Sequence, residues 1–183
     1  MSYFGEVALG SSFQPFATFQ EQFGFVPKLF RAQTLLPWVI QAESTLISAI
    51  LFTDKVLART QKECILLVLA AANQNAYCLC LHYQMLKLLG IAEQRLDQIV
   101  TDYRQADLSP ATSALLTLVF KLGTKEAVQE ASARGLNDES ILEAILIAGG
   151  TDRRLLVGGV WRSGGNCGGR AAAVGDAGDL ERG

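Results

Sequence analysis

Residues 63–82 decide the fold, and they read Glu-Cys-Ile-Leu-Leu-Val-Leu-Ala-Ala-Ala-Asn-Gln-Asn-Ala-Tyr-Cys-Leu-Cys-Leu-His. The apolar run Cys64–Ala72 is followed by the interruption Asn73-Gln74-Asn75 and then by a second helical stretch that stops at Gly90. Asparagine is a favoured helix N-cap, and glycine favours the position just after a helix. The stretch therefore predicts two consecutive helices, the second running from about Ala76 to Leu89.

The start of the first of these helices is indicated by the order Thr60-Gln-Lys-Glu63. A threonine followed three residues later by a glutamate has the form of a capping box, in which each side chain bonds to the backbone at the other position. We therefore expect Thr60 to cap this helix and Glu63 to lie in its first turn.

Apolar residues recur with a helical period along most of the chain, which predicts an all-α helical bundle of six to eight helices. Proline removes a helical hydrogen bond, so Pro37 is expected to divide the long stretch 29–52. Ser109 and Asn137 are expected N-caps. The other predicted helices cover residues 16–23, 93–103, 111–122, 125–133 and 138–148.

The chain is expected to contain one helical domain, residues 1–150, followed by a glycine-rich tail, residues 151–183. Eleven of its 17 glycines fall within residues 149–183. A segment of this composition buries too little apolar surface to offset the entropy lost on ordering. We therefore expect the tail to be disordered or divergent in sequence.

The bulk composition excludes several classes of function. The net charge is −2 and the Lys and Arg residues form no cluster, which argues against a nucleic-acid partner. The longest apolar run, Cys64–Ala72, is far shorter than the roughly 20 residues that span a bilayer, so no membrane association is expected. The N-terminus has no secretory signal, and the four cysteines are not spread as in a disulfide-stapled fold, which favours a cytoplasmic location.

A candidate catalytic set is formed by Cys78, His82 and Glu63. Cys78 and His82 are four residues apart on one predicted helix, so both lie on one face. With Asn75 as the N-cap, Cys78 falls in the first turn, where the helix dipole favours the reactive thiolate. The imidazole of His82, the single histidine of the chain, could move a proton, and Glu63 from the preceding helix could orient the ring.

Each of these residues also has a structural interpretation. A helical cysteine is more often a core residue than a nucleophile, and a lone histidine beside apolar residues usually has no chemical role. Glu63 has a capping role of its own. Cys80 lies two residues beyond Cys78 and should point to another side of the helix, so no disulfide between them and no metal site is expected.

The pattern resembles the alkylhydroperoxidase D core of the carboxymuconolactone decarboxylase-like family. The family signature is Glu, eleven residues, Cys, two residues, Cys, three residues, His. Glu63, Cys78 and His82 occupy matching positions, and Tyr77 matches an aromatic residue common before the second cysteine. Residues 24–30, 57–63 and 135–144 resemble the family's flanking segments, so the resemblance covers about residues 24–148.

The resemblance implies an alkylhydroperoxidase D-like helical fold and a peroxidase-type oxidoreductase. Catalytic roles are then expected for Cys78, His82 and Glu63, without a cofactor or a metal ion. The expected substrate is a hydroperoxide or a small organic acid, and the expected partner is an external thiol or a thioredoxin-like reductant. Family members commonly form homo-oligomers, so a homo-oligomer is expected here as well.

One departure from the family pattern keeps alternatives open. The family's first cysteine is replaced by Asn75, which cannot serve as a resolving thiol. Cys167 lies in the glycine-rich tail and is not an obvious substitute. A carboxymuconolactone decarboxylase-like acid/base enzyme and a non-catalytic helical oligomer therefore remain alternatives to the peroxidase.

Overall fold

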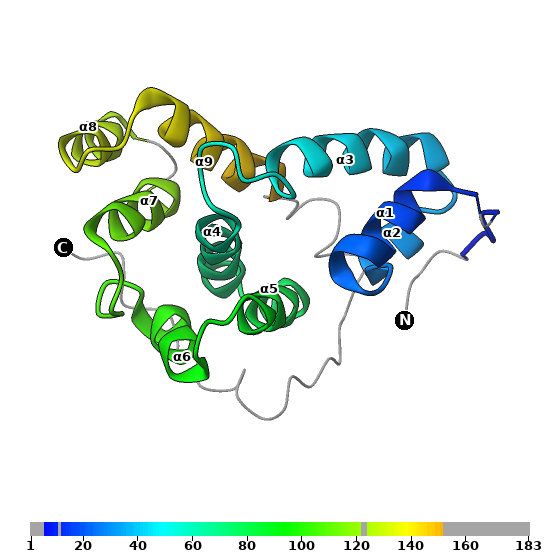
Figure 1. Cartoon of the computed structure of the whole chain (residues 1–183), viewed down its shortest axis with the longest axis horizontal. Coiled ribbons are helices and arrows are strands. Elements are labelled where there is room, and N and C mark those ends of the chain that lie inside the picture. Colours follow the sequence, from blue (N-terminus) through cyan, green and yellow to red (C-terminus); the bar gives the residue numbers. More distant parts are fainter. Residues whose placement is uncertain (1–5, 11, 122–123, 152–183) are drawn as a thin grey trace.

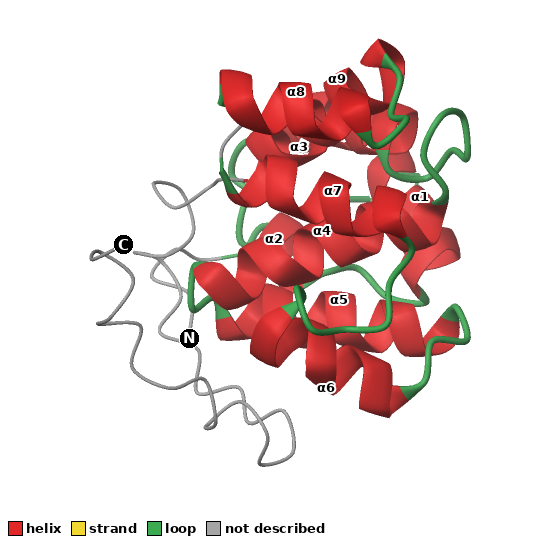
Figure 2. Cartoon of the chain, turned by 90° about the vertical axis from the view of Figure 1, so that its left-hand side faces the viewer, coloured by secondary structure: helices red, strands yellow, loops and turns green. Residues whose placement is uncertain are grey.

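The fold is seen in a computed structural model, which describes residues 6–10, 12–121 and 124–151. The described residues are all-helical, as predicted, and contain no strand (Figure 2). They form nine helices rather than six to eight. The helices are α1 (Gln14–Phe23), α2 (Lys28–Arg31), α3 (Pro37–Ile50), α4 (Arg59–Ala72), α5 (Ala76–Leu88), α6 (Glu93–Asp102), α7 (Pro110–Phe120), α8 (Lys125–Ala133) and α9 (Asp138–Thr151).

Helix α4 lies at the centre of the bundle, with α5, α6, α7 and α9 packed around it (Figure 1). This position follows from its sequence, because apolar side chains cover almost its whole circumference and must be buried on several sides. The fully or nearly fully buried residues of α4 include Ile65, Leu66, Leu67 and Val68. Helices α1, α2 and α3 form a side layer with a core of its own, where Phe19 stacks on Phe30 with ring centroids 3.9 Å apart.

A tight turn joins α4 to α5 and folds them against each other. Gln74 adopts the left-handed conformation, with φ 52°. Its N–H donates to the carbonyl of Ala71 at 3.0 Å, and the N–H of Asn75 donates to the carbonyl of Ala70 at 2.9 Å. These two bonds form a Schellman motif, which satisfies carbonyls at the end of α4. The next residue after the turn already belongs to α5.

The predicted caps of three helices are confirmed. The side chain of Asn75 accepts from the N–H of Cys78 at 3.1 Å, that of Ser109 from Thr112 at 3.2 Å, and that of Asn137 from Ser140 at 2.8 Å. Pro37 begins α3 and separates it from α2, as expected.

The predicted capping box of α4 is wrong. The N-cap is Ala58 rather than Thr60, and Thr60 lies inside the helix. The exposed N–H groups at this end are capped from elsewhere: Gln61 Oε1 accepts from the N–H of Ala58 at 3.0 Å, and Asp54 Oδ1 accepts from the N–H of Arg59 at 2.5 Å. Glu63 is therefore not needed as a cap, and its carboxylate is available for other contacts.

Within the described part of the chain, no helix is both long enough and apolar enough to cross a membrane. The tail predicted at residues 151–183, with Cys167, lies outside the described residues except for Thr151, which ends α9.

Candidate active site

The centre of the site is a buried pair formed by Glu63 of α4 and His82 of α5. Glu63 Oε2 lies 2.7 Å from His82 Nδ1. Glu63 is 0% exposed and His82 is 8% exposed. The expectation that folding of these two helices brings the carboxylate to the imidazole is therefore confirmed. The other imidazole nitrogen, Nε2, makes no hydrogen bond to any residue that the structure describes.

Arg59 completes this pair, and sequence reasoning did not single it out. It lies one turn before Glu63 on α4, and its Nε donates to Glu63 Oε1 at 2.7 Å. Its Nη2 lies 2.7 Å from the same oxygen. The guanidinium carbon sits 4.9 Å from the centroid of the Phe52 ring, a cation–π contact. The four-residue spacing of Arg59 and Glu63 was the available signal, because such pairs meet on a helix surface.

The pKa of the Glu63 carboxyl lies below its ordinary value. Burial by itself raises this pKa, since it penalises the charged form. The hydrogen bond and charge of His82, together with the charge and hydrogen bond of Arg59, outweigh that effect. Glu63 is thus an ionised carboxylate held in the interior, and it acts only as a hydrogen-bond acceptor.

Cys78 lies in the first turn of α5, one helical turn before His82. Its side chain is partly exposed. Its own N–H is taken up by the Asn75 side chain, so the cap and the cysteine are directly linked. The dipole of α5 remains favourable to negative charge at this position.

Cys64, next to Glu63, has the opposite environment. It is 6% exposed and belongs to the main core cluster. Burial, with the charge of Glu63 as a further cause, raises the pKa of its thiol to about 11. A thiol with so little thiolate is unreactive at neutral pH.

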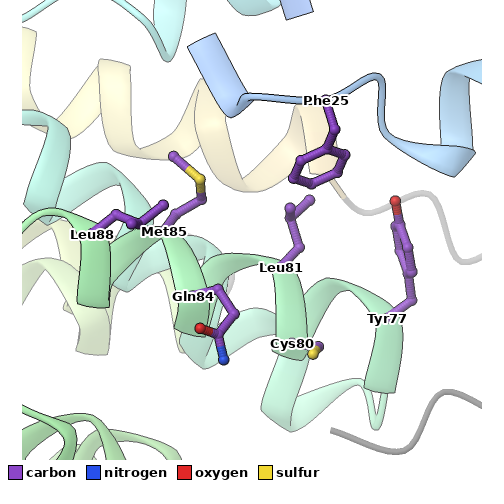
Figure 3. Close-up of a pocket in the computed structure, with 7 residues that line it drawn as sticks. All are labelled: Phe25, Tyr77, Cys80, Leu81, Gln84, Met85 and Leu88. Carbon is purple, nitrogen blue, oxygen red and sulfur yellow. The ribbon is translucent and has the colours of Figure 1, made fainter. Parts of the chain in front are cut away.

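A different face of α5 lines a cavity of about 230 Å³ beside Phe25 (Figure 3). Tyr77 stands at one end of it, and its hydroxyl accepts from the N–H of Lys28 at 3.0 Å. Burial raises the pKa of Tyr77. Cys80 borders this cavity and Cys78 does not, so the two cysteines point to different sides, as the helical period predicts. The lining residues are Phe25, Tyr77, Cys80, Leu81, Gln84, Met85 and Leu88.

The described residues contain no group of three or more His, Cys, Asp or Glu side chains placed to hold a metal ion. The chemistry available at Glu63, His82 and Cys78 is proton transfer and thiol chemistry. A buried carboxylate–imidazole pair can move a proton, and a cysteine at a helix start can act as a nucleophile.

The segment that carries these residues is similar to a known family. Residues 42–120 match the model of the Carboxymuconolactone decarboxylase family. This match confirms the resemblance indicated by the spacing of Glu63, Cys78 and His82. No curated protein matches the chain.

Solved structures share the fold of this chain. An alkylhydroperoxidase AhpD core, an uncharacterized peroxidase-related protein from Ralstonia eutropha JMP134, is 23% identical with a TM-score of 0.72, over 81% of this chain and 84% of that one. An uncharacterized peroxidase-related protein from Silicibacter sp. TM1040 is 19% identical with a TM-score of 0.73, over 84% and 86%.

A third similar structure has a different named activity. It is a cysteine-to-alanine variant of the debrominase Bmp8 in complex with 2,3,4-tribromopyrrole. It is 18% identical with a TM-score of 0.70, over 82% of this chain and 86% of that one. At these identities the likeness establishes the alkylhydroperoxidase D-like fold, and this fold carries more than one activity.

Proposed function

We propose that this protein is a thiol-dependent peroxidase in which Cys78 is the nucleophile, His82 the proton carrier and Glu63 the residue that orients His82. The observation that carries the proposal is the buried Glu63–His82 contact of 2.7 Å, one helical turn from Cys78 at a capped helix start. The peroxidase-related names of similar structures agree with this choice.

The reaction follows from the chemistry of the three groups. The Cys78 thiolate attacks the terminal oxygen of a hydroperoxide, and a sulfur–oxygen bond forms as the oxygen–oxygen bond breaks. The sulfur is oxidised to a sulfenic acid and the peroxide is reduced to an alcohol. The proton that completes the leaving alcohol comes from His82, which first took it from the thiol.

Reduction of the sulfenic acid requires a thiol from outside the site. Asn75 occupies the position of a resolving cysteine, and Cys64 is buried in the core. An external thiol, either a small molecule or a thioredoxin-like protein, attacks Cys78 to give a mixed disulfide and water. A second external thiol then attacks the mixed disulfide, which releases the Cys78 thiol and joins the two external thiols in a disulfide. A homo-oligomer is part of the proposal, by analogy with the family.

The test is treatment with an organic hydroperoxide, followed by trapping with a dimedone-type probe and mass mapping. We expect one added oxygen and one trapped site, at Cys78. Cys78→Ser should abolish trapping, while Cys64→Ser should leave it unchanged, because the Cys64 thiol is buried and its pKa is about 11. An unmodified Cys78 after prolonged exposure would contradict the proposal.

A second candidate is an acid/base enzyme of the decarboxylase kind. It is favoured by the completeness of the Glu63–His82 pair without any cysteine, and by Asn75 in place of the first motif cysteine. The debrominase structure shows that a peroxidase is not the only named activity on this fold. If Cys78→Ser retains turnover of an organic acid while Glu63→Gln loses it, this candidate replaces the peroxidase. A non-catalytic oligomer would show neither activity.

A further inference from the structure

We propose that Arg59 is a positioning residue of this site: it holds the Glu63 carboxylate ionised, and Glu63 in turn fixes the proton of His82 on Nδ1. The inference rests on the proposed function for its catalytic meaning, although its structural part stands alone. Among the described residues no hydrogen bond or ion pair joins Arg59 to His82, so Arg59 acts through Glu63.

The carboxylate divides its two oxygens between two partners. Oε1 receives Arg59, with Nε and Nη2 both at 2.7 Å, and Oε2 receives His82 Nδ1 at 2.7 Å. An ionised carboxylate accepts hydrogen bonds and cannot donate them. His82 Nδ1 must therefore carry a hydrogen while Glu63 is charged, and in the neutral ring the lone pair that can take a proton is then on Nε2.

A neutral Glu63 would favour the other tautomer of His82. A protonated Glu63 can donate to Nδ1, which moves the ring hydrogen to Nε2 and removes the proton acceptor from the site. Burial pushes Glu63 towards that state, since the side chain is 0% exposed. The charged or titratable groups that act on Glu63 are Arg59 and Cys64 on α4 and His82 on α5. Among them, Arg59 is the permanent positive charge.

Arg59 is itself held in place. Its side chain is only 14% exposed, and its guanidinium lies over the Phe52 ring. The N–H of Arg59 is fixed by Asp54 at the start of α4. A guanidinium that is packed on one face and hydrogen-bonded through Nε is pre-organised, unlike the exposed Arg134–Glu130 pair at the end of α8, where the separation is 3.5 Å.

The test uses the fact that His82 is the only histidine of the chain. The full-length protein, purified without a histidine tag and labelled with ¹⁵N-histidine, gives one imidazole whose tautomer can be assigned by NMR. Ionisation of Glu63 is followed in parallel by infrared difference spectra against Glu63→Gln. We expect the wild type to hold the Nδ1–H tautomer and an ionised Glu63 through neutral pH.

In Arg59→Gln the midpoint of Glu63 protonation should rise by about one to three pH units, the usual effect of removing a close opposite charge. The Nδ1–H fraction should fall in the same pH range. The acid limb of Cys78 oxidation should move upward by the same amount, while the rate at high pH recovers because Glu63 ionises there anyway. Arg134→Gln, which breaks the exposed pair, should change none of these readouts.

Arg59→Lys keeps the charge and loses the planar fork, so it should raise the Glu63 midpoint by less than Arg59→Gln does. If Arg59→Gln fails to fold, Arg59→Met takes its place, because it also removes the charge and keeps an apolar stem beside Phe52: an unchanged midpoint overturns the proposal, and a raised one supports it. Equal tautomers and midpoints in folded Arg59→Gln and wild type also overturn it. A wild-type Cys78 that never oxidises refutes the peroxidase instead, and leaves the NMR result to decide the role of Arg59.

Discussion

Two neighbouring residues of α4, Lys62 and Glu63, each anchor a buried polar network, and the two networks differ in kind. Lys62 reaches Glu143 on α9, whereas Glu63 reaches His82 on α5 with Arg59 behind it. Both side chains are 0% exposed. The difference between them indicates which buried charges hold the fold together and which are available for chemistry.

The Lys62 network is closed. Its ammonium has three N–H donors, and these meet the carbonyls of Ile50 and Thr53 at 2.8 and 2.6 Å and Glu143 Oε1 at 2.7 Å. Glu143 Oε2 accepts from the N–H of Leu57 at 2.9 Å. Every N–H donor of the ammonium therefore has an acceptor. The network joins the end of α3, the loop after it, α4 and α9, and it leaves no donor of Lys62 available for chemistry.

The Glu63 network differs because it contains an imidazole, His82, which can both accept and donate a proton. His82 Nε2 has no hydrogen-bond partner among the described residues, and the residue as a whole is 8% exposed. An imidazole arranged in this way can exchange a proton with a neighbouring group. The comparison therefore assigns a structural role to Lys62 and supports the proposed chemical role of His82.

Removing Lys62 should give the largest effect on stability. Lys62→Met leaves the Glu143 carboxylate and two carbonyls without their donor, and breaking one side of a buried pair costs about 3–5 kcal/mol. Urea unfolding followed by circular dichroism measures the loss. Lys121→Met, which removes an exposed partner of Glu130, should cost less than about 1 kcal/mol. Equal losses in the two variants would show that the Lys62 network is not a structural anchor.

His82→Gln should have the opposite effects to Lys62→Met: a large loss of reaction rate and a small change in stability. Loss of a positioned proton carrier typically slows a reaction about 10²-fold or more. We expect oxidation of Cys78 by hydroperoxide, followed by quenched mass analysis, to slow by that order, while the unfolding midpoint changes far less than in Lys62→Met. A large loss of stability with little change in rate would place His82 among the structural residues.

Asn75→Cys tests the residue that separates this site from the family signature. The change supplies a thiol three residues before Cys78 but removes the side chain that caps α5, at a cost of about 1 kcal/mol. We expect a disulfide with Cys78 after peroxide treatment and turnover with a dithiol raised by about tenfold. Asn75→Ser, which keeps a capping oxygen without a thiol, should show neither. A disulfide without faster turnover would favour the acid/base enzyme.

Local sequence signals predicted much of this fold. The helix starts at Asn75, Ser109 and Asn137 could be predicted because a cap bonds to a backbone group only three residues away. The approach of Glu63 to His82 could be predicted because a short turn joins their helices. The helical period also predicted that Cys80 points away from Cys78, and the structure agrees.

Features that depend on distant parts of the chain could not be predicted in this way. Thr60 was wrongly predicted as the cap because α4 begins earlier, at Arg59, where Asp54 from the preceding loop accepts from the backbone N–H. Lys62 gave no signal as an anchor, since its partner Glu143 lies 81 residues further along the chain. Arg59 had the right spacing to Glu63, but an exposed pair of that spacing is common, and only the packing on Phe52 distinguishes it.

The smallest effect is expected at the turn that sets α5 against α4. Helices α4 and α5 end with the same two backbone bonds, but the left-handed position is Gly90 after α5, with φ 88°, and Gln74 after α4, with φ 52°. A side chain at such a position costs about 1–2 kcal/mol, and glycine avoids this cost while adding freedom to the unfolded chain. Gln74 is exposed, so its side chain contributes no burial.

Gln74→Gly should therefore raise the free energy of unfolding by about 0.5–1 kcal/mol, measured by urea unfolding. Gln74→Ala keeps a Cβ at the strained position and should change stability by less than that. Neither variant touches Glu63, His82 or Lys62, so the rate of Cys78 oxidation should stay within about twofold of wild type. An equal gain from alanine and glycine would mean that the backbone conformation at Gln74 is not the cause. A stability gain with a changed rate would mean that the turn itself controls how Glu63 meets His82.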